Sequence, residues 1–266
     1  MNSLELFKTQ KFYQIDISIL KDLGYDVLLS NRIFDSLLFW KYDILFSYFY
    51  RYSFFAALLA KCFGKKTYFT GGIDSLDSDY ASAFNYKIQA LFFKLCYWVA
   101  DSCIIVSQSD LKNIFKVSSL KKKLSYSEHV INTKLFIADV PKEKIFTSIV
   151  WMGDEGNVVR KGVDKALQIF AELKKIPEFV DYRFVIIGRK GEGEVLVRSI
   201  IDKYNLKGSV ELKGEVSEED KINLLKQSKY YFQLSLYEGF GLAALEALCA
   251  NNIIIHSGKG GLANPI

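Results

Sequence analysis

The sequence predicts an α/β protein of two Rossmann-like domains, each with a mainly parallel, doubly wound sheet. Short β-rich runs alternate with helical patterns along almost the whole chain. Some of these runs, such as F-V-I-I at 184–187 and I-I-I at 253–255, are apolar on both faces, as in a parallel sheet between two helical layers. The apolar periodicity lapses over Asn132–Lys144, where we place the domain boundary.

The predicted strands are rich in β-branched and aromatic residues: Tyr25–Ser30, Tyr42–Ser47, Lys66–Thr70, Ser102–Ser107, Ile145–Met152, Tyr182–Ile187, Val210–Lys213, Tyr230–Ser235 and Asn252–His256. The predicted helices share apolar positions at helical spacing: Phe12–Leu23, Phe54–Cys62, Tyr86–Val99, Val163–Lys175, Glu194–Tyr204, Glu218–Gln227 and Leu242–Ala250. Ser217 with Asp220 resembles a capping box and predicts a helix start there.

The alternation of strands and helices, with the loss of apolar periodicity between them, predicts two domains, residues 1–138 and residues 139–266. Two such domains create a cleft between them, where small molecules commonly bind. In open α/β sheets the ligands lie at the carboxyl ends of the strands. We therefore look for functional residues where predicted strands end.

Composition restricts the class of protein. Half of the residues are hydrophobic and 24% are charged, which is typical of globular chains. The net charge of +5 fits an anionic ligand or lipid surface but is too small to indicate a nucleic-acid partner. No run approaches the ~20 apolar residues of a spanning helix. The opening M-N-S-L-E-L-F-K lacks the pattern of a signal peptide, so we expect a cytoplasmic protein.

The cysteines do not indicate a metal site. Cys62, Cys96, Cys103 and Cys249 are scattered, form no C-x-x-C pair and accompany only two histidines. We expect reduced thiols, mostly buried, and no metal cofactor.

The most informative segment is Ser235–Ala250, S-L-Y-E-G-F-G-L-A-A-L-E-A-L-C-A. It follows a predicted strand, turns through two glycines and opens a helix. Such glycines let the backbone approach a ligand, and a helix N-terminus offers N–H groups to phosphate. Glu238 then lies in the turn, near the phosphates, and Glu246 lies deeper, within reach of ribose hydroxyls. Two solvated glutamates near a helix start are the plainer alternative.

Y-E-G-F-G-L-A-A-L-E-A-L resembles the signature of glycosyltransferase family 4, the retaining enzymes of the GT-B fold. Four other segments are similar to the same family in the same order: I-V-W-M-G with R-K-G-V-D-K-A-L, R-F-V-I-I-G-R-K-G-E-G, S-V-E-L-K-G-E-V-S-E-E-D and N-N-I-I-I-H-S-G-K-G-G-L. The resemblance implies a nucleotide-sugar donor site in the C-terminal domain and two domains facing a cleft.

The resemblance also implies roles for single residues. Lys161 would neutralise the donor diphosphate and Glu238 would contact the transferred sugar, which makes these two the catalytic candidates. Backbone amides of the glycine turn would hold the phosphates, Glu246 the ribose and the loop Gly214–Val216 the base. The remaining donor-binding candidates complete this set: Arg160, Gly239, Phe240, Gly241 and Leu242. The plainer alternative for Arg160 and Lys161 is a solvated pair at a helix start, but the helix dipole disfavours cations there, which favours a bound anion.

The sequence departs from the family in two places. The family commonly has a basic residue after the glycine that ends the opening strand, but here Asp154 and Glu155 follow, and two carboxylates would weaken diphosphate binding unless they turn away. A histidine often occupies the site near Thr70–Asp74, where this chain has T-G-G-I-D. Gly71, Gly72 and Asp74 are the acceptor-side candidates, although a tight turn would also explain the glycine pair. His129 we assign a structural role.

The resemblance further implies that the family's first strand and its last helices are missing, since the chain stops at Pro265-Ile266. The function it implies is transfer of a sugar from a nucleotide sugar to a glycan or lipid-linked acceptor, in surface polysaccharide or glycoconjugate synthesis. The protein would work in the cytoplasm, with peripheral association at the inner face of the membrane as an option. The alternative is a catalytically weak nucleotide-sugar-binding fragment or partner subunit. A nicotinamide-dependent oxidoreductase is excluded because no G-x-G-x-x-G follows the first strand.

Overall fold

The computed structural model describes residues 4–5, 7, 11–137 and 140–263. Contacts divide the chain into two compact units, Met1–Ile131 and Asn132–Ile266, and each is described by itself. The unit boundary falls at the edge of the Asn132–Lys144 lapse. The domain limit between residues 138 and 139 lies outside the described residues, as do Pro265 and Ile266 and part of the opening M-N-S-L-E-L-F-K.

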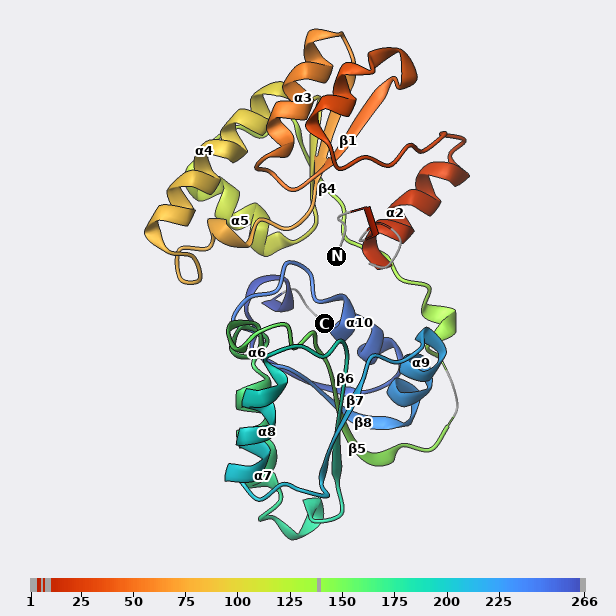
Figure 1. Ribbon diagram of the computed structural model, residues 1–266, viewed down its shortest axis with the longest axis vertical. Helices are drawn as coiled ribbons and strands as arrows, with labels where there is room; N and C mark the ends of the chain where they lie inside the picture. Colours follow the sequence, from red (N-terminus) through yellow and green to blue (C-terminus); the bar gives the residue numbers. More distant parts are fainter. Residues whose placement is uncertain (1–3, 6, 8–10, 138–139, 264–266) are drawn as a thin grey trace. The chain divides into compact units, whose positions relative to one another are not determined.

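The first unit is a four-stranded parallel sheet in the order β1-β2-β3-β4, flanked by helices (Figure 1). Its elements in chain order are α2 (Lys11–Asp22), η1 (Ile33–Leu37), η2 (Phe39–Lys41), β1 (Ile44–Tyr48), α3 (Ser53–Cys62), β2 (Lys66–Thr70), η3 (Asp74–Leu76), α4 (Ala83–Val99), β3 (Ser102–Ile105), α5 (Gln108–Val117) and β4 (Leu124–Tyr126). Phe69, Phe93 and Ile105 are buried in the core between the sheet and its helices.

The second unit is a five-stranded parallel sheet in the order β7-β6-β5-β8-β9. Its elements are η4 (Thr133–Leu135), β5 (Glu143–Ile149), α6 (Glu155–Lys161), α7 (Val163–Leu173), η5 (Pro177–Phe179), β6 (Arg183–Ile187), α8 (Glu194–Lys203), β7 (Val210–Gly214), α9 (Glu218–Gln227), β8 (Ser228–Gln233), α10 (Leu242–Cys249), β9 (Ile253–His256) and η6 (Gly260–Ala263).

Helices cover both faces of the second sheet, which confirms the doubly wound prediction (Figure 1). Phe184 and Ile186 of β6 pack on the side of α7 and α8, whereas Val185 and Ile187 lie in a second cluster with Leu224 of α9. Four consecutive buried residues in β6 explain why F-V-I-I is apolar without alternation. The I-I-I run of β9 differs: β9 is an edge strand and Ile253 is exposed.

One predicted strand is wrong. Tyr25–Ser30 forms no strand in the structure, and Leu28 within it is 70% exposed. An apolar run becomes a strand only where a neighbouring strand offers a ladder, and in the described part of the chain β1 pairs with β2 alone. Conversely, the prediction missed β4, α5 and α6. A capping signal marked α5, because the Ser107 Oγ accepts from the Asp110 N–H at 3.1 Å.

A half-buried lysine ties the entry of the second unit to two of its helices. Lys142 donates from Nζ to the carbonyl oxygens of Lys226 at 2.8 Å and Leu225 at 3.3 Å, in the last turn of α9. It also donates to the Ala250 carbonyl at the end of α10. The ammonium thus caps both helix C-termini, where carbonyls lack intrahelical partners and the dipole favours a cation.

Lys142→Met should therefore lower the free energy of unfolding by about 1.5–3 kcal/mol, the scale for hydrogen bonds to a charged group. Lys144→Met is the matched control, because the Lys144–Asp181 pair at 3.0 Å is exposed and should contribute less than about 1 kcal/mol. Urea unfolding of both variants measures the difference. Equal losses would show that the Asn252 amide, which also donates to the Leu225 and Ala250 carbonyls, is sufficient for these helix ends.

Candidate active site

The candidate site lies where the strand order of the second sheet reverses. β5 opens this unit and is flanked by β6 on one side and β8 on the other. The chain leaves β5 and β8 in loops that diverge at such a point, and a crevice forms at the carboxyl ends. The segments after β5 and after β8 contain most of the donor-site residues predicted from the sequence.

Lys161 and Glu238 meet at this edge. The Lys161 Nζ lies 2.5 Å from the Glu238 Oε1, although 77 residues separate them in the chain, and both side chains are mostly buried. Lys161 ends α6, and Gly162 follows in the left-handed region at φ 70°. An added Cβ on Gly162 would lie 2.1 Å from the Leu234 carbonyl oxygen. Only glycine lets the α6–α7 junction rest on the segment after β8.

The placement of Arg160 and Lys161 at a helix start is wrong. Both occur in the last turn of α6, where the helix dipole favours cations, so the dipole gives no argument for a ligand. The short α6 was hidden by its glycine and by its length of seven residues. Arg160 turns to its own helix and donates to the Asn157 Oδ1 at 2.8 Å. Its backbone carbonyl accepts from the Leu236 N–H at 2.8 Å.

Two further donors converge on the same oxygen of Glu238. The Gln233 Nε2 lies at 2.9 Å and the Ser235 Oγ at 2.7 Å from Oε1. The Tyr231 hydroxyl donates to the Gln233 Oε1 at 3.1 Å, which turns the amide nitrogen toward Glu238. Neither Gln233 nor Ser235 was predicted as a site residue. The available signal was two polar residues, one at the end of the buried strand β8 and one two positions later, since polar residues in a buried strand need partners.

Tyr231 is held as a hydrogen-bond donor by its environment. The side chain is fully buried, and this burial raises the pKa of Tyr231 well above its usual value, with the charge of Glu238 as a smaller cause in the same direction. Its oxygen accepts from the Ile149 N–H at 3.3 Å. A chain of hydrogen bonds thus runs from Ile149 through Tyr231 and Gln233 to Glu238 and fixes the orientation of the carboxylate.

The turn before α10 has the predicted geometry. Gly241 is the N-cap at φ 91°, and no side chain of the described residues caps this end. The N–H groups of the first turn at Leu242 are therefore available to an anion. Gly239 and Phe240 precede this cap, and the second glycine-rich loop lies on their backbone, because the Gly261 N–H donates to the Glu238 carbonyl at 2.6 Å.

Glu246 is buried in α10 and pairs with a lysine that sequence reasoning missed. The Lys221 Nζ of α9 lies 2.7 Å from the Glu246 Oε2. Gly214 ends β7 with φ 79°, and Val216 follows at the same carboxyl edge, directly before α9. The capping box predicted for α9 is confirmed by the Asp220 N–H, which donates to the Ser217 Oγ at 3.0 Å.

The acidic pair after β5 is partly accounted for. The Asp154 Oδ1 accepts from the Asn157 N–H at 2.6 Å and caps α6, so this carboxylate serves a helix start. Glu155 is exposed in the first turn. Trp151, 55% exposed, stands beside them with its ring against Gly153.

The acceptor-side candidates follow β2 in the first unit. Gly71 adopts φ 108° and packs on Phe49, and Asp74 opens η3. The Ile73 N–H between them donates to the buried Asp110 Oδ2 at 3.2 Å. This geometry is that of a tight turn held from α5, and the acceptor role of Gly71, Gly72 and Asp74 stays a prediction.

A titratable cluster lies at the end of β1. The Tyr48 hydroxyl donates to the Asp16 Oδ2 at 2.9 Å, and the His129 ring lies 6.0 Å from that of Phe12. Burial raises the pKa of Asp16, against smaller lowering effects of the Tyr48 hydrogen bond and the His129 charge. Burial lowers the pKa of His129, against the charge of Asp16. Both shifts favour the neutral forms.

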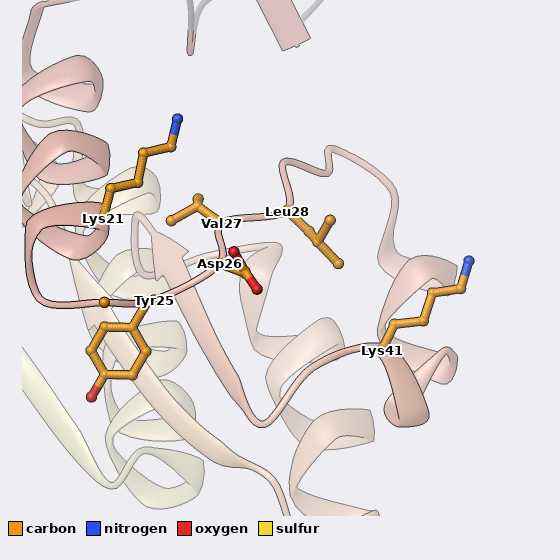
Figure 2. Close-up of a pocket in the computed structure, with 7 residues that line it drawn as sticks. Lys21, Tyr25, Asp26, Val27, Leu28 and Lys41 are labelled. Atoms are coloured by element: carbon orange, nitrogen blue, oxygen red, sulfur yellow. The ribbon is translucent and has the colours of Figure 1, made fainter.

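A surface hollow of about 700 Å³ in the first unit contains none of these residues (Figure 2). It lies along the segment 24–28, which was predicted as a strand, with the ammonium groups of Lys21 and Lys41 on either side. Its size alone does not make it the site, because the convergent polar groups lie in the second unit.

Gly162→Ala should lower the free energy of unfolding and displace Lys161, because the new Cβ collides with a carbonyl oxygen. Gly208→Ala is the control: Gly208 has φ 81° but open space around its Cβ position. We expect about 1–2 kcal/mol for Gly208→Ala, the cost of a left-handed non-glycine residue, and more for Gly162→Ala. Chemical denaturation compares them, and equal losses would contradict the close approach.

Asp16→Asn should raise the melting temperature at pH 7. A carboxyl whose pKa is raised by burial destabilises the fold when it is ionised, and this cost fades as the pH falls through the raised pKa. The amide keeps an oxygen for Tyr48 and removes the charge, so the gain should shrink toward pH 4. Asp79→Asn, on the exposed surface, should change little. A gain that does not depend on pH would count against this cause.

Residues 156–266 match the family glycosyl transferases group 1. Over 101 residues the chain is 36% identical to the GDP-mannose:cellobiosyl-diphosphopolyprenol alpha-mannosyltransferase of Xanthomonas oryzae pv. oryzae, a stretch covering 37% of this chain and 26% of that protein. Over 105 residues it is 30% identical to one subunit of the human phosphatidylinositol N-acetylglucosaminyltransferase, covering 40% of this chain and 21% of that protein. The chain thus spans about a quarter of the length of these relatives.

Solved structures show the same fold. HepE of Anabaena, in complex with UDP and glucose, superposes with a TM-score of 0.67 over 93% of this chain and 71% of its own, at 14% identity. Sucrose-phosphate synthase of Thermosynechococcus elongatus gives 0.66 over 97% of this chain and 62% of its own, at 19% identity. The resemblance drawn from the motifs is confirmed: the second unit matches the model of glycosyl transferases group 1 over residues 156–266, and the two α/β units have the GT-B fold.

Proposed function

We propose that this protein transfers a sugar from a nucleotide-sugar donor to a glycan or lipid-linked acceptor, with retention at the anomeric carbon. The observation that supports this best is the Lys161–Glu238 contact of 2.5 Å beside the uncapped N-terminus of α10. A cation and a helix N-terminus at one point suit a diphosphate. A carboxylate held beside them suits a sugar hydroxyl.

The roles follow from these positions. An ammonium has three donors, so Lys161 can keep Glu238 and still contact a diphosphate oxygen. The first-turn amides at Leu242 would bind the same group, and together they would stabilise the nucleoside diphosphate as it leaves. Glu238, fixed by Gln233 and Ser235, would accept a hydroxyl of the transferred sugar. Glu246 would bind the ribose. No metal cofactor forms part of the proposal.

We also propose a lipid-linked acceptor and a place at the inner face of the membrane. Two relatives have a diphosphopolyprenol or a phosphatidylinositol in their names. The chain has a net charge of +5, and its first unit exposes Leu28, Phe34 and Trp40. Cations with exposed apolar side chains suit an anionic bilayer surface. The described helices include none long and apolar enough to cross a bilayer.

A second candidate is a subunit that binds a nucleotide sugar without transferring it. The human relative is named as one subunit of its enzyme, and this chain matches only 21% of it. Hydrolysis of the donor distinguishes the candidates, because a transferase slowly passes the sugar to water whereas a binding subunit leaves the donor intact.

Titration calorimetry of the full chain with UDP and GDP tests the donor site. We expect one of them to bind, and Lys161→Met to weaken it ten- to a hundredfold, which corresponds to about 1.5–3 kcal/mol for a charged hydrogen bond. Binding of the matching nucleoside should change far less, since it lacks phosphate. Lys165→Met, exposed on the next helix, is the control. Equal losses for diphosphate and nucleoside would assign Lys161 to the fold instead.

A further inference from the structure

A buried ion pair joins α9 to α10. The Lys221 Nζ lies 2.7 Å from the Glu246 Oε2, and the two side chains are 13% and 4% exposed. Lys221 is also 3.0 Å from the Glu218 Oε1 at the start of α9. Glu218 faces solvent, so it holds the ammonium from the outer side while Glu246 holds it from within.

Burial makes Glu246 depend on Lys221. A carboxylate this far from water is costly unless a counter-charge faces it. A carboxylate accepts hydrogen bonds, and each is stronger than a bond between neutral groups. Hydroxyl groups of a ribose are donors that fit such an oxygen, provided that the carboxylate is held in one orientation.

The pair is not explained by packing alone. Apolar residues of similar volume would join α9 to α10 as well, since replacing a buried ion pair by well-packed hydrophobic residues is often neutral or stabilising. The capping box of Ser217 and Asp220 already fixes the first turn of α9. The need to join the two helices therefore does not by itself account for a lysine at this position.

We propose that Lys221 is a positioning residue of the donor site. It supplies the counter-charge of the Glu246 carboxylate and anchors one of its oxygens, so that the group is presented to the ribose hydroxyls of the nucleotide. The inference rests on the proposed function, because it takes Glu246 as the ribose contact. It adds a residue from α9 to a site otherwise formed by α6, α10 and the loop after β8.

The test compares nucleoside diphosphates that differ only in the ribose. Titration calorimetry of the full chain uses UDP and GDP, each beside its 2′,3′-dideoxy form, which has the same phosphates. The wild type should bind the ribose form about tenfold more tightly or better, the scale of hydrogen bonds to a charged group. In Lys221→Met this ratio should fall to near one. Lys221→Arg should keep it, and Lys226→Met, on the same helix, should leave it unchanged.

The ratio separates positioning from mere support of the fold, because a general fold defect weakens binding of the ribose and dideoxy forms alike and leaves their ratio unchanged. Lys221→Gln is made as well, in case the methionine variant does not fold.

Each outcome of these titrations either supports or overturns the inference. A ratio preserved in folded Lys221→Met or Lys221→Gln overturns the inference and leaves the donor site standing, as does tighter binding, which would mean that Lys221 competes with the ribose. If Lys221→Met and Lys221→Gln both fail to fold while Lys221→Arg folds, the lysine serves stability, and this result also overturns the inference. Failure of the wild type to bind either diphosphate would overturn the proposed function and this inference with it.

Discussion

The site depends on backbone lying directly against backbone. At Gly162 the α6–α7 junction rests on the Leu234 carbonyl with no room for a side chain, and at Gly260 the last loop rests in the same way on the Glu238 carbonyl. These contacts hold three loops in one layer at the end of the sheet. Because the backbones touch, the side chains of Lys161 and Glu238 above them are brought to 2.5 Å. The close backbone contacts at the glycines therefore bring the two charged side chains together, and their mutual attraction is not needed for this placement.

The second feature of the candidate site is that each of its two carboxylates is balanced by a lysine. The two glutamates of the E-x7-E segment each face a lysine, Lys161 for Glu238 and Lys221 for Glu246. One lysine comes from α6 and the other from α9, so the two carboxylates are held by opposite sides of the unit. Without a ligand these pairs are neutral. At the proposed donor site a diphosphate would then depend on the α10 N-terminus and on the other donors of the Lys161 ammonium for its attraction.

Much of this was predictable from the sequence, for physical reasons. β2 and α9 have the predicted bounds, because their runs are bordered by turn and capping residues. Glu238 and Glu246 were found because a local motif contains both. Lys221 and Gln233 were missed because their meaning depends on partners distant in the sequence. Tyr25–Ser30 was wrong because a strand needs a neighbour, and no local pattern reports whether one exists.

Trp151 makes the second unit accessible to tryptophan fluorescence. The chain has three tryptophans, and Trp40 and Trp98 belong to the first unit. Trp151 is then the single indole of the second unit, half exposed where β5 ends and the candidate site begins. Its emission depends on how much water reaches the ring. With Trp40 and Trp98 replaced by phenylalanine, Trp151 would be the only fluorescent indole, and its emission would report changes beside the candidate donor site without an attached dye.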